Sequence, residues 1–480
     1  MEEIEDQKIL TDVTIKNFRY LILFGFIVTF FISLFIFINY VYDYTLSVSF
    51  LSFYILVLLS LFNLKWVWLL IIFLTPFSIE IFIPQFSFAT QFPTEPLIAT
   101  VILVWILRTL LNKNITFAAS SFNIPIIIFF SICIISLIKS DYLLYSIKGL
   151  ITLLFYILIG YFFALNNVKN KKDVERVILL LIFLSLVFSV FGIYNHFFSK
   201  DLFLQNITKG VPRPFFPEHG SYAAFITFGF AFALNLGLNP KNNLLTWIFR
   251  VCAVIIFTGI ILSFTRAAWL GALFLIVFSF WFTLLKKFSV KNIFILLMII
   301  LIFCLIIYLL VLNTDILVHF FTIYDISNLS NLERFNRWAA AIKMFKDSPV
   351  LGVGYDTYTS NYYYYRNFNY STLLSSAFMG VHSEFLKVLS ETGLLGFISF
   401  ILLLSIFFRE GFKVYNRIND LFLKLIILGI IGGFSSYLIH GIFNNFTKFD
   451  KVAIPFWLSF GLIGAIGRLI KENKVDDNQR

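Results

Sequence analysis

Apolar runs of about 20 residues recur throughout this sequence and constrain its fold more than any other feature. A helix needs about 20 mostly apolar residues to cross the hydrocarbon layer of a bilayer, because lipid offers its backbone groups no hydrogen-bond partner. Hydrophobic residues make up 60% of the 480 residues and charged residues only 13%, whereas a soluble domain averages about 25% charged residues. The sequence therefore predicts an all-α polytopic membrane protein, with a single membrane domain over residues 1–480.

About fourteen apolar segments are expected to span the membrane, and the count falls to twelve if the short segments 96–111 and 122–138 do not. The predicted spans are 19–40, 45–63, 66–84, 96–111, 122–138, 148–166, 176–197, 221–238, 247–264, 267–285, 292–312, 383–408, 421–440 and 452–470.

The distribution of Lys and Arg tests this arrangement independently. With the N-terminus inside, the inner segments carry 23 Lys and Arg residues and the short outer loops carry 8. Because basic residues accumulate in cytoplasmic loops, both termini are expected to be cytoplasmic. The same bias explains the net charge of +11 without a nucleic-acid partner.

One connection, residues 313–381, is much longer than the others and is expected on the outer side. A loop of this length is usually functional or disordered, and this one has the signals of a folded, partly helical sub-domain. Ser330 and Glu333 have the spacing of a capping box, Pro349 should end the helix, and Gly352 to Gly354 should turn the chain. The residues expected on one amphipathic face, which could lie along the membrane surface, are Leu332, Phe335, Trp338, Ala339, Ile342 and Phe345.

Charged residues near the outer ends of the spans are the candidates for function, because such charges are costly unless they are paired or face a wet cavity. Arg266 lies between two apolar runs in LSFTRAAWLGAL. An arginine that snorkels at a helix end is the ordinary explanation. The functional explanation is an anion clamp, since a guanidinium binds phosphate oxygens in a bidentate manner.

Two further outer segments carry arginines. The loop KGVPRPFFPEHGSYAAF places Arg213 between prolines, with Glu218 and His219 beside the positive N-terminal end of the next helix. A rigid polar turn and a binding site explain this loop equally well. On the predicted loop helix, Arg334 and Arg337 lie one turn apart, and for Arg337 we favour an ordinary solvated face.

His382 stands where the long loop re-enters the membrane. A lone histidine is more often a packing residue than a catalyst, but a pKa of ~6.5 suits a base near neutral pH. Lys387 and Glu391 are spaced i, i+4 and should form a structural ion pair. His440 has no recognisable partner and is expected to be a packing residue, as are the histidines at 196 and 319.

Several kinds of chemistry lack their residues in this sequence. No zinc-type spacing, Asp-x-Asp pair, Ser-His-Asp arrangement, phosphate-binding glycine loop or nucleotide fingerprint occurs. Neither a metal nor a cofactor is therefore expected.

Four stretches, taken together and in order, resemble the O-antigen ligase and polymerase superfamily of bacterial membrane glycosyltransferases. They cover about residues 200–400 and read RPFFPEHGSYAAF, LSFTRAAWLG, ERFNRWAAAIKMFKDSPVLGVGYDTY and HSEFLKVLSETGLLGF. The resemblance implies a GT-C-like fold in the bacterial inner membrane. It also implies metal-independent, inverting transfer of a glycan from undecaprenyl diphosphate, with the active site facing the periplasm.

The resemblance also implies residue roles. His382 would be the catalytic base, Arg213 and Arg266 would hold the diphosphate, and Arg334 would add a contact from the loop. Accessory candidates are Arg337, Glu218, His219 and Glu391. The family often has an asparagine-rich turn where this sequence has Pro217-Glu218-His219, which leaves Glu218 and His219 without an assigned role.

Three functions remain open at this point. The leading one is an O-antigen ligase, which transfers the glycan to the lipid A-core sugars of a lipopolysaccharide. The nearest alternative is a polymerase that joins lipid-linked repeat units with the same clamp and base. A flippase or transporter of lipid-linked oligosaccharides would suit fourteen spans, but transporters tend to have repeated halves and polar residues at the midplane, and neither is visible in this sequence.

Overall fold

A computed structural model describes residues 64–83, 88–112, 118–198, 211–241, 243–285, 329–367 and 380–472, with scattered residues between 289 and 305. The predicted spans 19–40 and 45–63 lie outside the described residues, as does most of span 292–312. The count of about fourteen spans therefore stays a prediction. The chain divides into two units, and in the first of these α3 (Leu64–Leu74) packs against α4 (Thr94–Asn112).

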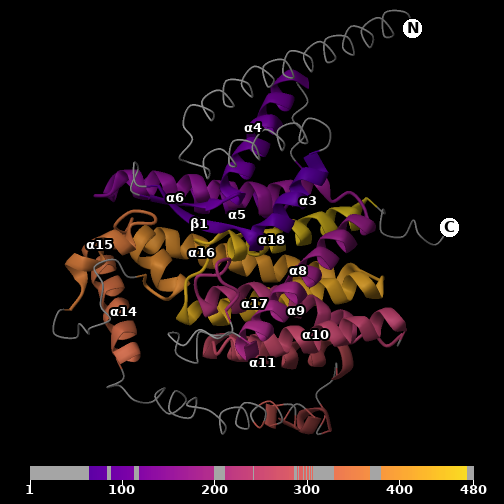
Figure 1. Ribbon diagram of the computed structural model, residues 1–480. Coiled ribbons are helices and arrows are strands. Elements are labelled where there is room, and N and C mark those ends of the chain that lie inside the picture. The colour runs from indigo at the N-terminus through magenta and orange to yellow at the C-terminus, as the bar shows by residue number, and fades with distance from the viewer. Residues whose placement is uncertain are drawn as a thin grey trace, which may run out of the picture. The chain divides into compact units, whose positions relative to one another are not determined.

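Eight helices within the described residues are long and apolar enough to cross a membrane, which confirms a mostly helical polytopic membrane protein (Figure 1). Each coincides with one predicted span. They are α6 (Leu143–Tyr156) with its continuation η4 (Ile157–Phe162) and α7 (Phe163–Asn167), α8 (Lys171–Phe198), α9 (His219–Gly237), α10 (Leu244–Leu262), α11 (Arg266–Phe280) with η6 (Trp281–Leu285), α16 (Glu384–Arg417), α17 (Leu421–Phe443) and α18 (Asp450–Lys471).

The predicted span 66–84 is wrong in its second half. Helix α3 ends at Leu74 and is followed by the 3-10 turn η1 (Thr75–Phe77). Strand β1 (Ile79–Ile83) then pairs with β2 (Phe88–Phe92) in a two-stranded sheet. Pro76 explains the break, because proline lacks an N–H and disfavours helical geometry in the residue before it. The short predicted spans 96–111 and 122–138 are helices, α4 and α5 (Asn123–Ser136).

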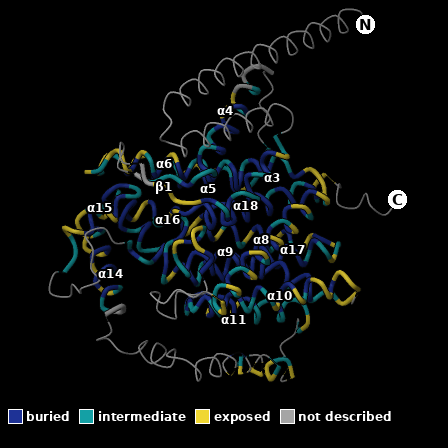
Figure 2. The backbone as a smooth tube through the Cα atoms, in the orientation of Figure 1, coloured by how far each residue is buried: buried dark blue, intermediate teal, exposed yellow. Residues whose placement is uncertain are grey.

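Helix α9 lies in the interior of the second unit, where α8, α10, α11 and α17 pack around it. Figure 2 shows α9 mostly buried, whereas α10 has an exposed side. Small residues make these contacts close: a side chain on Gly229 would collide with Ser185 of α8, and one on Gly433 with Ala231 of α9. Small residues at helix crossings let backbones approach in the absence of water.

The helix ends show that consecutive helices alternate in direction. At one end, which we name the basic end, Lys171 at the start of α8 pairs with Asp420 before α17 at 2.7 Å, and Arg468 near the end of α18 donates to the Val168 carbonyl at 2.8 Å. At the other end, the loop end, Glu384 at the start of α16 contacts the connection between α17 and α18. The connections between α7 and α8 and between α16 and α17, both predicted to be cytoplasmic, share the basic end.

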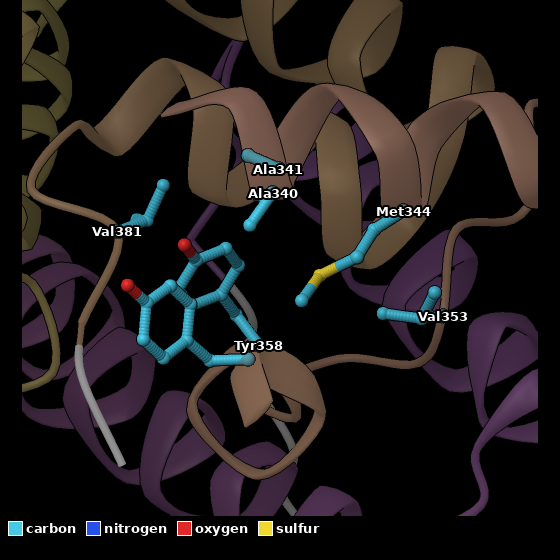
Figure 3. Packing of buried hydrophobic residues seen from close by; sticks show 7 residues of the cluster. Ala340, Ala341, Met344, Val353, Tyr358 and Val381 are labelled. Atoms are coloured by element: carbon cyan, nitrogen blue, oxygen red, sulfur yellow. The ribbon is translucent and has the colours of Figure 1, made fainter. Parts of the chain in front are cut away.

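The described part of the long loop contains two helices, α14 (Leu329–Asp347) and α15 (Tyr358–Tyr365). They pack against each other with the side chains of Ala340, Met344, Val353 and Val381 around Tyr358 (Figure 3). The folded, partly helical loop is therefore seen in these residues, although its two remaining parts, 313–328 and 368–379, lie outside the described residues.

One detail of α14 differs from the sequence interpretation. The helix begins at Leu329, so Ser330 lies within the first turn and is not the N-cap of a capping box. Phe335 and Ile342 of the predicted amphipathic face are 51% and 44% exposed, and the location of this face along a membrane surface stays a prediction. The other face packs against α15, where the small side chains of Ala340 and Ala341 allow the bulky tyrosines of α15 to come close. The predicted end of the helix before Pro349 is confirmed.

The loop is fixed to α16 by backbone hydrogen bonds. The Val353 amide donates to the Ser390 carbonyl at 3.0 Å, and the Leu394 amide donates to the Pro349 carbonyl at 2.8 Å. Gly393 breaks the regular geometry of α16 here, with φ of 64° and ψ of −163°. This backbone region is almost exclusive to glycine, so Gly393 is needed where the two segments cross.

We expect Gly393→Ala to destabilise the protein by about 3 kcal/mol, because alanine is strained at this φ and ψ and its Cβ would lie 2.4 Å from the Val350 carbonyl group. Gly380→Ala is the matched control, since the nearest atom to its added Cβ is 3.8 Å away. Thermal unfolding of both variants in detergent checks this. Equal melting temperatures would show that the crossing is not tight.

Candidate active site

His382 is held in an unusual backbone conformation by two separate parts of the chain. Its φ is +53°, a left-handed value that is rare for residues other than glycine. Its amide donates to Asn445 Oδ1 at 3.0 Å, and its carbonyl accepts from Trp338 Nε1 of α14 at 3.4 Å. Strained residues that the surroundings fix in this way cluster at functional sites, which makes His382 a candidate on structural grounds.

The imidazole of His382 has one ring nitrogen engaged. Nδ1 lies 3.3 Å from Asn444 Oδ1, and an amide oxygen can only accept, so Nδ1 carries the hydrogen and Nε2 keeps a lone pair. Burial lowers the pKa of His382 to about 4, the charge of Arg337 acts in the same direction, and the Asn444 hydrogen bond opposes both. The ring is therefore neutral at pH 7 and can accept a proton through Nε2.

A buried carboxylate, Glu384, fixes the segment that holds His382. It accepts hydrogen bonds from Tyr437 Oη at 2.6 Å, from the Thr447 amide at 2.8 Å and from Thr447 Oγ1 at 2.8 Å. Its own amide donates to the Asn444 carbonyl at 3.2 Å. Sequence reasoning missed Glu384, Asn444 and Asn445, although an acidic residue two positions after His382 at a helix start was a usable signal.

Arginines from two segments, α11 and α14, influence each other electrostatically close to His382. Burial lowers the pKa of Arg334, and the nearby charges of Arg266 and Arg337 lower it further. The charge of Arg334 also acts on His382. Arg266 begins α11, two residues after Phe264, which has a left-handed φ of 50°. The structure thus brings Arg266, Arg334, Arg337 and His382 into one electrostatic cluster, which we name the cationic cluster.

The solvated position expected for Arg337 is wrong. This side chain is buried, and Glu333 lies one helical turn away with its Oε2 3.9 Å from Arg337 Nη2. The Tyr358 hydroxyl of α15 also donates to the Arg337 backbone carbonyl at 2.7 Å. By contrast, no carboxylate lies within ion-pair distance of Arg266 or Arg334 among the residues that the structure describes.

Two more histidines adjoin the cationic cluster. His219 is the first residue of α9 and interacts electrostatically with Arg334. The electrostatic neighbours of His440, on α17, are His219 and Arg334. His440 is buried, its ring contacts Phe446, and its Nε2 has no hydrogen-bond partner among the described residues. The sequence predicted only that His440 packs against its neighbours. It did not predict that His440 lies near the cationic cluster, because the sequence does not show which helix ends meet.

The other predicted residues take different positions. The Arg213 side chain is exposed in the turn before α9, and no contact to the cationic cluster is found for it among the described residues. Glu218 occupies the N-cap position of α9, but its side chain makes no capping hydrogen bond. The functional roles of both residues stay predictions.

Glu391 and Lys387 do not form the predicted direct pair. Lys387 Nζ binds Asp356 Oδ1 at 3.1 Å, and Glu391 accepts from the amides of Asp356 at 3.0 Å and Tyr358 at 3.1 Å. The loop residue Asp356, which has a left-handed φ of 59°, lies between them, and the sequence alone does not reveal it. These contacts tie the loop to α16 and suggest a structural role for Glu391.

No group of three or more His, Cys, Asp or Glu side chains is placed to hold a metal ion in the part of the chain that the structure describes. Among the described residues of the cationic cluster, the polar groups without a carboxylate partner are the guanidinium donors of Arg266 and Arg334, and beside them lies the lone pair of His382. Such a set can bind an anion with several oxygens and accept one proton beside it.

The fold and this cluster define a class: a multi-pass membrane protein with a cationic, histidine-containing site where a folded loop rejoins its helices. Residues 251–401 of this chain match the model of a protein family described as O-antigen ligase. The match confirms the resemblance to the O-antigen ligase and polymerase superfamily and implies a glycosyltransferase or ligase type of activity in general. It includes all four residues of the cationic cluster. No curated protein matches the chain.

The lowered pKa of His382 predicts how stability depends on pH. An unfolded histidine has a pKa of ~6.5, so between about pH 6.5 and pH 4 the unfolded chain binds a proton that folded His382 does not. Stability therefore falls on acidification through this window, by an amount on the order of 1–2 kcal/mol at pH 5. We expect the melting temperature of His382→Gln to fall less than that of the wild type between pH 7.5 and pH 5. Parallel pH dependences would contradict the lowered pKa.

Proposed function

We propose that the protein is an O-antigen ligase that transfers a glycan from undecaprenyl diphosphate to the lipid A-core sugar of a lipopolysaccharide. The observation that carries this proposal is the meeting of Arg266, Arg334 and Arg337 with a neutral His382 at the loop end. The family match at residues 251–401 supports the general class of reaction. The proposed location is the outer face of the bacterial inner membrane, in agreement with the bias of Lys and Arg toward the other side.

The donor would be bound through its diphosphate. This group carries concentrated negative charge, and guanidinium groups recognise its oxygens through paired hydrogen bonds. Arg266 and Arg334 lack carboxylate partners among the described residues, so their charges are available to the diphosphate. The repulsion between the guanidinium charges of Arg266 and Arg334 favours an anion between them, and no metal is required to balance the charge.

The reaction would be a single displacement. The acceptor hydroxyl oxygen attacks the anomeric carbon while the bond from that carbon to the diphosphate oxygen breaks, and the electron pair leaves with undecaprenyl diphosphate. Nε2 of His382 takes the proton of the hydroxyl. Attack from the face opposite the leaving group inverts the anomeric configuration. The arginines stabilise the charge that develops on the leaving oxygen.

A polymerase that joins lipid-linked repeat units would use the same groups, and the family match does not distinguish the two. Deletion of the gene separates them. If long glycan chains accumulate on the lipid carrier and none is attached to lipid A-core, the protein is a ligase. If single repeat units still become attached to the core, the protein is a polymerase and the ligase proposal fails.

We expect His382→Gln to lower the rate of transfer by about 10²–10⁴-fold, because an amide of similar size cannot accept the proton. Transfer of lipid-linked glycan to lipid A-core in proteoliposomes measures this rate. His196→Gln on α8 is the control and should retain activity, since His196 lies outside the cationic cluster. Near-normal transfer by a folded His382→Gln variant would eliminate the proposed base.

For Arg266 we expect alanine to lower transfer by on the order of 10²-fold or more, and lysine to restore only part of it. Lysine keeps the charge but cannot make the paired hydrogen bonds of a guanidinium. The same proteoliposome assay, with donor concentration varied, measures both variants. Equal activity with lysine and arginine would argue against a bidentate contact to the diphosphate.

A further inference from the structure

A second site lies away from the cationic cluster, at the far end of α14. It is an open pocket of about 650 Å³ between the turn before α6 and the two loop helices. Its lining residues, which we name the tyrosine pocket, are Asp141, Tyr142, Lys343, Asp347, Asn361, Tyr364 and Tyr365. None of these residues has a part in the transfer chemistry proposed above.

The tyrosines of this pocket offer aromatic surface and hydroxyl groups that can form hydrogen bonds. Tyr364 is 70% exposed. Its hydroxyl interacts with that of Tyr142 and raises the pKa of Tyr142. Burial and a hydrogen bond with Asp347 raise the pKa of Tyr365. The hydroxyls of Tyr142 and Tyr365 therefore stay protonated at neutral pH, and the faces of these two rings remain uncharged.

The remaining lining groups are hydrogen-bonding and slightly acidic. Asp141 and Asp347 provide carboxylates, Asn361 provides an amide, and Lys343 provides one ammonium, whose Nζ lies 3.4 Å from the Tyr365 carbonyl. Two carboxylates against one ammonium disfavour an anionic ligand by simple charge repulsion. A few convergent polar groups on aromatic walls are typical of a small-molecule site.

Sugar rings fit this combination of groups. A pyranose has a face of C–H groups that packs on an aromatic ring, and a rim of hydroxyls that both donate and accept hydrogen bonds. Tyrosine supplies the matching apolar body and polar tip, and carboxylates accept from sugar hydroxyls. A lipid chain would leave the lining carboxylates desolvated and unpaired, which is costly.

Helix α14 connects this pocket to the cationic cluster. Lys343 and Asp347 follow Arg334 by nine and thirteen residues, which is about 14 and 20 Å along a helix that rises about 1.5 Å per residue. We infer that the tyrosine pocket binds neutral or amino sugars of the lipid-linked donor glycan, several sugar residues from its diphosphate. This inference rests on the proposed function for the identity of the donor.

Binding of free glycan tests the pocket without any transfer. The probe is the oligosaccharide released by mild acid from the lipid-linked pool of the native cell, added to the full chain in nanodiscs. We expect Tyr364→Ala to weaken binding at least tenfold. The matched control is Tyr363→Ala, because Tyr363 is also exposed on α15 but does not line the pocket. Its affinity should stay within about twofold of wild type.

Steady-state transfer then identifies which substrate occupies the pocket. Tyr364→Ala should raise the KM for a donor with a long glycan, with kcat unchanged, and should leave the KM for a donor with a single sugar unchanged. An increase in the acceptor KM alone would overturn the assignment to the donor. Wild-type affinity for the probe in both Tyr364→Ala and Tyr142→Ala would overturn the pocket as a sugar site.

The two proposals fail in distinguishable ways. His382→Gln should bind the released oligosaccharide as the wild type does while it loses transfer. If His382→Gln transfers normally, the proposed base is wrong, but the probe affinities of Tyr364→Ala and Tyr363→Ala still decide whether the tyrosine pocket binds sugar.

Discussion

The contact between the start of α16 and the connection of α17 to α18 determines the geometry of the candidate site. Glu384 accepts three hydrogen bonds there, and the adjacent residues Asn444 and Asn445 hold the ring and the backbone of His382. A buried carboxylate is costly unless its acceptor sites are filled. The Glu384 contacts therefore fix the relative position of three chain segments, and with them the direction in which Nε2 of His382 presents its lone pair.

Charges at the loop end of the helices fall into two groups, and the contrast between them indicates which group binds a ligand. Lys387 is neutralised by Asp356. Lys451 is buried with Asp450 and donates to Ser78 at 2.9 Å. These pairs connect loops to helices and leave no net charge, so they stabilise the fold without a ligand. The cationic cluster, in contrast, holds three guanidiniums near one another with a single carboxylate at ion-pair distance in the described part of the chain. An anionic substrate would supply the missing charge.

Sequence patterns predicted those features that depend on local chemistry. Apolar runs located the eight long helices, and Pro349 marked the end of α14. Features that depend on distant segments were not accessible. The tyrosines of α15 determine which side of α14 is buried. Phe335 is exposed, so the expectation that Arg337 lies on a solvated face opposite a buried Phe335 was wrong. The motifs indicated His382 and Arg334, but the residues that position them come from helix ends far along the chain.

Charge coupling between the arginines and His382 has a consequence for the proposed reaction. Burial and the charge of Arg337 hold the pKa of His382 at about 4, so the imidazole is neutral but a weak base. A bound diphosphate would offset the guanidinium charges and so raise the pKa of His382, while burial, the larger cause, would still hold that pKa below its ordinary value. The imidazole would thus be a stronger base when the donor occupies the arginines. A general base is most effective when its pKa lies near the operating pH, so donor binding would itself activate the histidine and limit proton transfer in the absence of the glycan.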